Sequence, residues 1–156
     1  MSVAIVPIAR EQSADLHACI DAVAREKRYL AQTFAKPRTD FDAFVRDSVA
    51  NDMIQYVALD GDRVVGWADI FAGWADAVRH CGGLRGQGIG ERLLRACLAK
   101  AQAKGITRVE LEARADNGRA IRLYQRLGFT HEARKRNAMR FDGVYYDAVQ
   151  MSILLA

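Results

Sequence analysis

Hydrophobic residues recur along the chain with two spacings, one typical of helices and the other of strands. An apolar position every three or four residues indicates an amphipathic helix, and this spacing extends over residues 13–28, 39–50, 88–104 and 117–127. Shorter apolar or alternating stretches predict strands over residues 3–8, 54–59, 64–71, 108–114, 130–140 and 144–155. The segments Asp60-Gly61-Asp62 and Phe141-Asp142-Gly143 each separate two predicted strands and are typical of hairpin turns.

The order of the predicted elements indicates the fold class. A strand is followed by two helices, two hairpin strands, a helix, a strand, a helix and two last strands. Strands joined through a helix favour parallel pairing, whereas hairpins favour antiparallel pairing. We therefore expect an α/β fold with a mixed central sheet and helices on both faces. With 156 residues and no linker or repeat, the chain is expected to form a single domain over residues 1–156.

Composition and charge exclude several classes of protein. Apolar residues make up 51% of the chain and charged residues 27%, which is typical of a globular domain and excludes a disordered or fibrous chain. The net charge of +4 is a mild excess that suits a small anionic ligand as well as a solvated surface. The basic residues within positions 134–140 alternate between the two faces of a strand without stacking aromatic residues, so we expect no nucleic-acid partner.

Neither a membrane segment nor a metal site is predicted. The longest apolar runs are too short to cross a bilayer, and the acidic residues Glu11 and Asp15 come too early for an export signal. Cys19, Cys81 and Cys97 lack the spacing of metal ligands. We expect a cytoplasmic protein with no membrane partner, no bound metal, and thiols that act as small hydrophobic groups.

Three glycines alternate at the start of the third predicted helix, in the segment Arg85-Gly86-Gln87-Gly88-Ile89-Gly90-Glu91. Glycine lets successive backbone N–H groups converge on one anion, and the helix N-terminus adds the positive end of its dipole. A pyrophosphate is the expected guest, and the alternative is a flexible turn before the helix. Glu91 stands where a P-loop has lysine and where the dinucleotide fingerprint has glycine, so both of those sites are disfavoured.

Two motifs resemble the GNAT superfamily of N-acetyltransferases. Arg85-x-x-Gly88-x-Gly90 matches the family signature Q/R-x-x-G-x-G/A, and one helix and one strand later the chain reads Asn117-x-x-Ala120-x-x-Leu123-Tyr124-x-x-x-Gly128-Phe129. The element order is similar to that of the whole GNAT fold, from Val3 to Leu155. The last hairpin resembles the branch that contains ribosomal-protein and small-amine acetyltransferases. The resemblance implies a mixed central sheet whose middle strands are splayed apart.

The resemblance also implies the ligands and the residues that bind them. The cosubstrate is acetyl-CoA, and the acceptor is the primary amine of a small molecule or a peptide N-terminus. The family often forms dimers, which leaves a homodimer open for this chain. The residues implied to bind the coenzyme are Arg85, Gly86, Gln87, Gly88, Ile89, Gly90, Glu91, Asn117 and Tyr124. Asn117 is equally well explained as a helix N-cap, and a protein that only senses acyl-CoA would use the same pocket.

Tyr124 and Glu110 are the expected catalytic residues. The family tyrosine that matches Tyr124 points its hydroxyl at the thioester sulfur, and a phenol with a pKa near 10 can protonate the departing thiolate. The alternative is a core aromatic side chain on an amphipathic helix. A protonated amine must lose a proton before it attacks. Glu110 is the first candidate for this base, directly or through water, with Glu112, Asp69 and His80 as alternatives.

The segment before the glycine motif departs from the family pattern. GNAT enzymes have a strand and a tight turn there, but only Cys81-Gly82-Gly83-Leu84 lies between His80 and Arg85, too little for a strand of about five residues and a turn. Either residues 74–81 form a shortened or displaced strand, or a loop is missing between Gly82 and Arg85. We favour the missing loop and expect a peptide C–N distance there well beyond the covalent ~1.33 Å.

Overall fold

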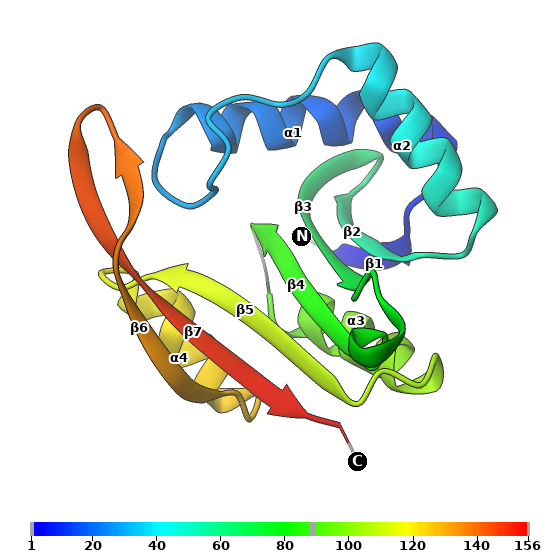
Figure 1. The fold of residues 1–156 in the computed structure, drawn as a ribbon. Helices are drawn as coiled ribbons and strands as arrows, with labels where there is room; N and C mark the ends of the chain where they lie inside the picture. Colours follow the sequence, from blue (N-terminus) through cyan, green and yellow to red (C-terminus); the bar gives the residue numbers. More distant parts are fainter. Residues whose placement is uncertain (1, 88–89, 156) are drawn as a thin grey trace.

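The computed structural model describes residues 2–87 and 90–155, which form one seven-stranded sheet and four α-helices (Figure 1). The strands are β1 (Val3–Pro7), β2 (Ile54–Asp60), β3 (Arg63–Ala72), β4 (Cys81–Gln87), β5 (Arg108–Arg114), β6 (Thr130–Phe141) and β7 (Val144–Leu154). The α-helices are α1 (Ser13–Arg25), α2 (Arg38–Ala50), α3 (Glu91–Ala103) and α4 (Gly118–Arg126). Two short 3-10 turns, η1 (Arg10–Gln12) and η2 (Asp76–Val78), lie in the connections.

The sheet is mixed, as the sequence predicts. Its strand order is β1-β2-β3-β4-β5-β7-β6, and β4 and β5 form a parallel pair among antiparallel ones. The β4–β5 pairing begins at Cys81 and Arg108 and ends at Gly83 and Glu110, although β4 continues to Gln87 and β5 to Arg114. The two middle strands therefore separate toward their carboxyl ends, which confirms the predicted splay.

Helices cover both faces of the sheet, which confirms the expected layers (Figure 1). On one face, Leu93 and Cys97 of α3 are fully buried against a core that includes Val109 of β5. On the other face, Leu16 of α1 and Val45 of α2 are buried in a second core with strand residues of β2 and β3. The connection between α1 and α2 reaches the β6–β7 hairpin, whose strands lie at the far edge of the sheet (Figure 1).

One ion pair joins the α1–α2 connection to the β6–β7 hairpin. Lys27 Nζ, just after α1, donates to Asp142 Oδ1 in the hairpin turn at 2.7 Å. Ser13 makes a second long-range contact: its hydroxyl donates to Asp42 Oδ1 of α2 at 2.6 Å. Ser13 therefore joins two helices, and the N-cap position of α1 belongs to Gln12.

β4 forms in the segment that the sequence analysis considered too short for a strand. It takes Arg85, Gly86 and Gln87 from the glycine motif, and each residue from Gly82 to Gln87 pairs with one residue of β3. The expected missing loop is wrong, because this register is continuous. The alternative of a displaced strand is also wrong, because residues 74–80 contain η2 and β4 begins only at Cys81.

A close approach of one side chain explains why glycine is found at position 82 in β4. A Cβ added to Gly82 would lie 2.5 Å from Ile70 Cγ2 on β3, so a larger residue would force the Ile70 side chain or its strand to shift. The apolar pattern that normally reveals a strand is weak here because three of its positions are glycines, namely Gly82, Gly83 and Gly86. Pairing with β3 on one side and β5 on the other holds the segment extended instead.

Candidate active site

Two cavities meet where β4 and β5 separate. The first, of about 850 Å³, lies against α4 and contains five arginines, so we call it the basic cavity: Arg28, Arg114, Arg119, Arg122 and Arg126. The second, of about 730 Å³, lies between the sheet and the α1–α2 segment, and we call it the central cavity. It is lined by Gln55, Asp69, Arg85 and Glu110 of the sheet and by Phe41 and Phe44 of α2, among others.

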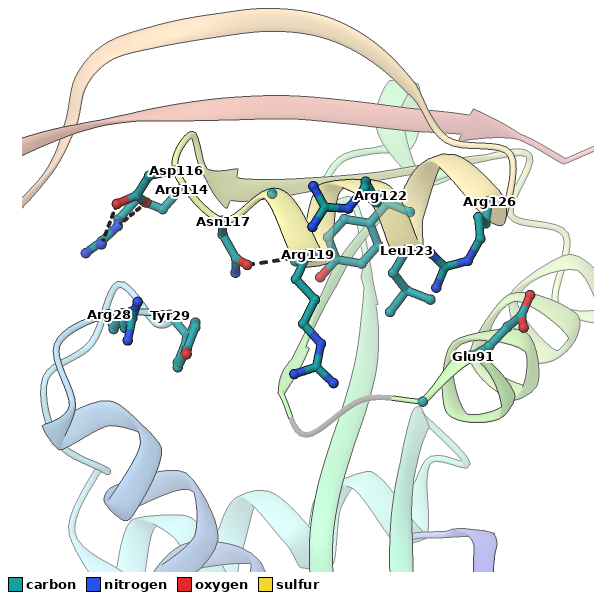
Figure 2. Close-up of a pocket in the computed structure, with 14 residues that line it drawn as sticks. Arg28, Tyr29, Glu91, Arg114, Asp116, Asn117, Arg119, Arg122, Leu123 and Arg126 are labelled. Carbon is teal, nitrogen blue, oxygen red and sulfur yellow. Dashed lines mark hydrogen bonds and ion pairs between the residues drawn. The ribbon is translucent and has the colours of Figure 1, made fainter.

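The basic cavity carries excess positive charge. Its two acidic residues are already paired, Glu91 with Arg95 at 2.7 Å and Asp116 with Arg114 at 2.6 Å. Its other four arginines have no carboxylate partner within the described residues: Arg28, Arg119, Arg122 and Arg126. In Figure 2, Arg119 extends from α4 into the space that faces Arg28 and Tyr29. Such a concentration of unpaired guanidinium groups attracts a small polyanion.

Asn117 begins α4 and lines both cavities. Its side-chain oxygen accepts a hydrogen bond from the backbone N–H of Ala120 at 3.2 Å. This bond satisfies one of the free N–H groups at the start of the helix. The N-cap interpretation is therefore confirmed, and a contact with a coenzyme stays a prediction.

Tyr124 is about two helical turns further along α4 and also lines both cavities. Its ring packs against Phe129, with 5.9 Å between the ring centroids, so the core-packing interpretation holds for one side of the ring. Burial raises the pKa of the Tyr124 hydroxyl above its ordinary value, so the group stays protonated at neutral pH. Since no other described residue bonds to this hydroxyl, its proton is available to a ligand.

The glycine motif is divided between a strand and a helix start. Arg85 and Gly86 lie within β4, and the Arg85 guanidinium donates from Nε to Asp69 Oδ1 at 3.0 Å and from Nη2 to Asp69 Oδ2 at 3.2 Å. Arg85 thus lines the central cavity, not the basic one. Gly88 and Ile89 lie outside the described residues. Gly90 is the N-cap of α3, and it lines the basic cavity with the first helical residue, Glu91.

The candidate bases differ in burial and in their partners. The Glu110 carboxylate accepts hydrogen bonds from Arg108 Nη2 at 3.0 Å and Gln150 Nε2 at 3.3 Å, and its side chain is 42% exposed. Glu112, two residues along β5, pairs with Lys135. Both glutamates line the central cavity. His80 precedes β4 at its other end and lines neither cavity.

Asp69 is the buried carboxylate of the central cavity, with a side chain 3% exposed. Burial raises the pKa of Asp69, and the adjacent Arg85 guanidinium opposes this shift. Neighbouring Gln55 on β2 is 1% exposed, and its amide nitrogen and oxygen have no hydrogen-bond partner in the structure. Sequence reasoning did not identify Gln55, although a polar residue in phase with Val57 on an apolar strand was a visible signal.

Two absences concern the whole described chain. Over residues 2–87 and 90–155, no three His, Cys, Asp or Glu side chains are grouped so that they could hold a metal ion. In the same residues, no helix combines the length and apolar character needed to cross a membrane.

Comparison with known proteins identifies the family. The family model described as "Acetyltransferase (GNAT) family" matches residues 17–129, which are most of the chain. The chain therefore belongs to this family. Among curated proteins, no sequence matches it.

Solved structures share the complete fold. An acetyltransferase of the GNAT family from Streptococcus pneumoniae has a TM-score of 0.88 at 23% identity, covering 99% of this chain and 100% of its own. Ribosomal-protein-alanine N-acetyltransferase from Brucella melitensis has a TM-score of 0.88 at 17% identity, covering 97% and 99%. A Salmonella typhimurium acetyltransferase, solved with its cofactor acetyl-CoA, has a TM-score of 0.91 at 17% identity, covering 100% and 95%. These similarities confirm the predicted GNAT fold.

Proposed function

We propose that the protein transfers the acetyl group of acetyl-CoA to the primary amine of a small molecule or a peptide N-terminus. The basic cavity binds the coenzyme, the central cavity binds the amine, and the two meet at the β4–β5 separation. The observation that carries this proposal is the position of Tyr124, a partly buried residue that lines both cavities and whose hydroxyl stays protonated.

The basic cavity fits the chemistry of the coenzyme. Coenzyme A carries a pyrophosphate and a further phosphate, and four arginines without carboxylate partners among the described residues are available to them. Backbone N–H groups of Gln87, Gly90 and Glu91 are proposed to bind the pyrophosphate at the start of α3, together with those of Gly88 and Ile89. The helix N-terminus favours such an anion electrostatically.

Tyr124 serves as the general acid. When the amine nitrogen bonds to the acetyl carbon, the carbon–sulfur bond breaks and the sulfur needs a proton. The Tyr124 hydroxyl supplies it and is then reprotonated from solvent. A rigid donor at this position contributes roughly 10²–10⁴-fold in general acid–base catalysis.

Glu110 is the proposed base, which removes a proton from the attacking amine directly or through water. Arg108 and Gln150 hold its carboxylate in place at the edge of the central cavity. Asp69 is less suited to this role because both of its oxygens already accept hydrogen bonds from Arg85.

The first experiment is a panel of small amines, amino acids and peptides with free N-termini, assayed for acetyl-CoA-dependent release of free thiol. At least one amine is expected to release thiol and gain one acetyl group by mass spectrometry. A protein that binds acetyl-CoA in calorimetry but releases no thiol with any amine is an acyl-CoA sensor, and the transferase proposal is then rejected.

Glu110→Gln, compared with Glu112→Gln, tests the base. Both changes remove a carboxylate from the same face of β5, but only the first removes the proposed base. We expect Glu110→Gln to lower kcat/KM for the amine about 100-fold at neutral pH, while Glu112→Gln changes it less than threefold. Equal losses in both variants would remove Glu110 from the mechanism.

A further inference from the structure

Three polar side chains form one row across the floor of the central cavity. Gln55 of β2 is opposite Asp69 of β3, and Asp69 is opposite Arg85 of β4. Because neighbouring strands lie about 4.8 Å apart, the row extends about 10 Å from the β4 edge of the strand separation. Gln55 is at its deep end, since it is 1% exposed whereas the Arg85 side chain is 58% exposed.

Gln55 is an unpartnered polar group in a cavity. Its amide has two donor hydrogens and an acceptor oxygen, and neither the nitrogen nor the oxygen bonds to any group in the structure. The cavity wall around it is largely apolar, with Ile20 of α1, Phe41 of α2 and Trp67 of β3. Buried amides are rarely left without partners, and a ligand group in this cavity can satisfy Gln55.

The charge at the deep end restricts the chemistry of that ligand. The Asp69 carboxylate and the Arg85 guanidinium neutralise each other, and Gln55 is uncharged. An ionised ligand group at Gln55 would lose its hydration without gaining a countercharge. An uncharged group with both a donor and an acceptor, such as a carboxamide, can form hydrogen bonds with both the nitrogen and the oxygen of the Gln55 amide.

We propose that Gln55 determines acceptor specificity by receiving an uncharged hydrogen-bonding group at the end of the acceptor opposite its amine. The acceptor is then a small primary amine with a carboxamide or similar group, lying along the row with its amine at the β4–β5 separation. This inference rests on the proposed acetyl transfer. The competing determinant is Lys36, a cation that lies 4.8 Å from the Phe44 ring centroid in the same cavity and would favour an anionic acceptor.

The test compares three series of matched chain length: ω-aminoalkanamides, ω-aminoalkanoates and n-alkylamines. With the wild-type protein, we expect kcat/KM from thiol release to be at least about tenfold higher for the best amide than for the alkylamine or carboxylate of equal length. Gln55→Met, which keeps the length of the side chain, should lower kcat/KM for the amide about tenfold and leave the alkylamine unchanged.

Ser48→Ala is the matched control. Ser48 of α2 is 2% exposed and its hydroxyl also lacks a partner, but it does not line the central cavity. Both changes remove a buried unsatisfied group, so both should preserve or raise the melting temperature. Only Gln55→Met should remove the preference for amides, and Gln55→Leu repeats the test if the methionine variant is poorly folded.

Several results would overturn the role of Gln55: a preference for carboxylates, equal losses for amide and alkylamine, or lost amide preference in Ser48→Ala. A binding measurement separates this inference from the proposed function. If no amine releases thiol, acetyl transfer is rejected, but the aminoalkanamide should still raise the melting temperature of the wild type and not of Gln55→Met. Absence of that difference rejects the Gln55 site as well.

Discussion

The basic and central cavities meet at Tyr124 but differ in whether their charged side chains are paired. In the basic cavity, four arginines have no carboxylate partner within the described residues. In the central cavity, each carboxylate is paired with a cation of the protein, as Asp69 is with Arg85 and Glu110 with Arg108. The first cavity is therefore suited to recognise a ligand through its electrostatic field, and the second through shape and hydrogen bonds.

This difference matches the proposed roles of the two cavities, in which the basic cavity binds the coenzyme and the central cavity binds the amine. A polyanionic coenzyme is shared by all members of an acetyl-CoA-dependent family, and a cluster of arginines binds it without fine adjustment. The acceptor is what distinguishes one such enzyme from another, and a site built to hydrogen-bond an acceptor group strongly rejects an analogue that lacks this group. Three predictions test whether the cavities are separate in this way.

The largest effect is expected at the point where the cavities meet. Tyr124→Phe removes only the hydroxyl, and the Phe ring retains the packing against Phe129. We expect kcat to fall roughly 10²–10⁴-fold, because the leaving sulfur loses its proton donor. The Kd for acetyl-CoA measured by calorimetry should change less than threefold.

Tyr145→Phe is the control for this change. Tyr145 lies on β7, is 54% exposed and lines neither cavity, so its hydroxyl can be removed without affecting either ligand. A Tyr124→Phe variant that weakens coenzyme binding while it keeps the wild-type kcat would show that the hydroxyl binds and does not donate a proton.

An intermediate effect is expected in the basic cavity. Arg119→Ala or Arg122→Ala should each raise the Kd for acetyl-CoA about three- to tenfold, because each removes a charged donor from an exposed site. The wild-type affinity should weaken as salt is added, and the double variant should lose most of that dependence. KM for the amine should stay unchanged if the cavities are separate.

Arg92→Ala provides the comparison. Arg92 also belongs to the helical surface near the glycine motif, but its Nη1 donates to the carbonyl oxygen of Val3 at 2.9 Å and it does not line the basic cavity. Calorimetry should give the same Kd for this variant as for the wild type. An equal loss on replacing Arg92 would mean that net charge, not the cavity, sets the affinity.

The same contrast explains what the sequence could and could not reveal. Asn117 and Tyr124 lie seven positions apart, so one motif predicts them together. Gln55, Asp69 and Arg85 come from three strands and meet only through strand register. A single sequence shows that each of them is polar, but it does not show that they are neighbours.

β4 shows a different limit of sequence reasoning. The helices and the remaining strands have local apolar patterns, and the structure confirms their order with small shifts at the ends. β4 has three glycines and one apolar residue of ordinary strand type, Leu84, so its extended conformation depends on pairing with β3 and β5. Arg85 was consequently assigned to a loop, whereas it lies in β4 and pairs with Asp69 in the central cavity; its contact with the coenzyme stays a prediction.

The smallest effect is expected on the free energy of unfolding, when the ion pair between Asp69 and Arg85 in the central cavity is removed. Burial raises the pKa of Asp69, against the opposing effect of Arg85, so the folded state binds this proton more tightly than the unfolded state does. The carboxylate therefore lowers stability at neutral pH, and this cost disappears as the pH falls through the folded-state pKa toward the ordinary pKa of 3.8. Asp69→Asn removes the carboxylate partner of Arg85, but the exposed Arg85 guanidinium can be hydrated instead. The substitution should therefore change the free energy of unfolding by about 1 kcal/mol or less at neutral pH.

Glu132→Gln gives the opposite dependence and so serves as the control. Hydrogen bonds from Arg108 and Ser152 lower the pKa of Glu132 from 4.5 to about 2, so the stability that this carboxylate contributes is present above pH 4.5 and is lost as the pH falls toward 2. In urea titrations at decreasing pH, the wild type should gain stability relative to Asp69→Asn and lose stability relative to Glu132→Gln. If both differences change in the same direction, Asp69 is hydrated in the folded protein, and the central cavity does not isolate its charges from water.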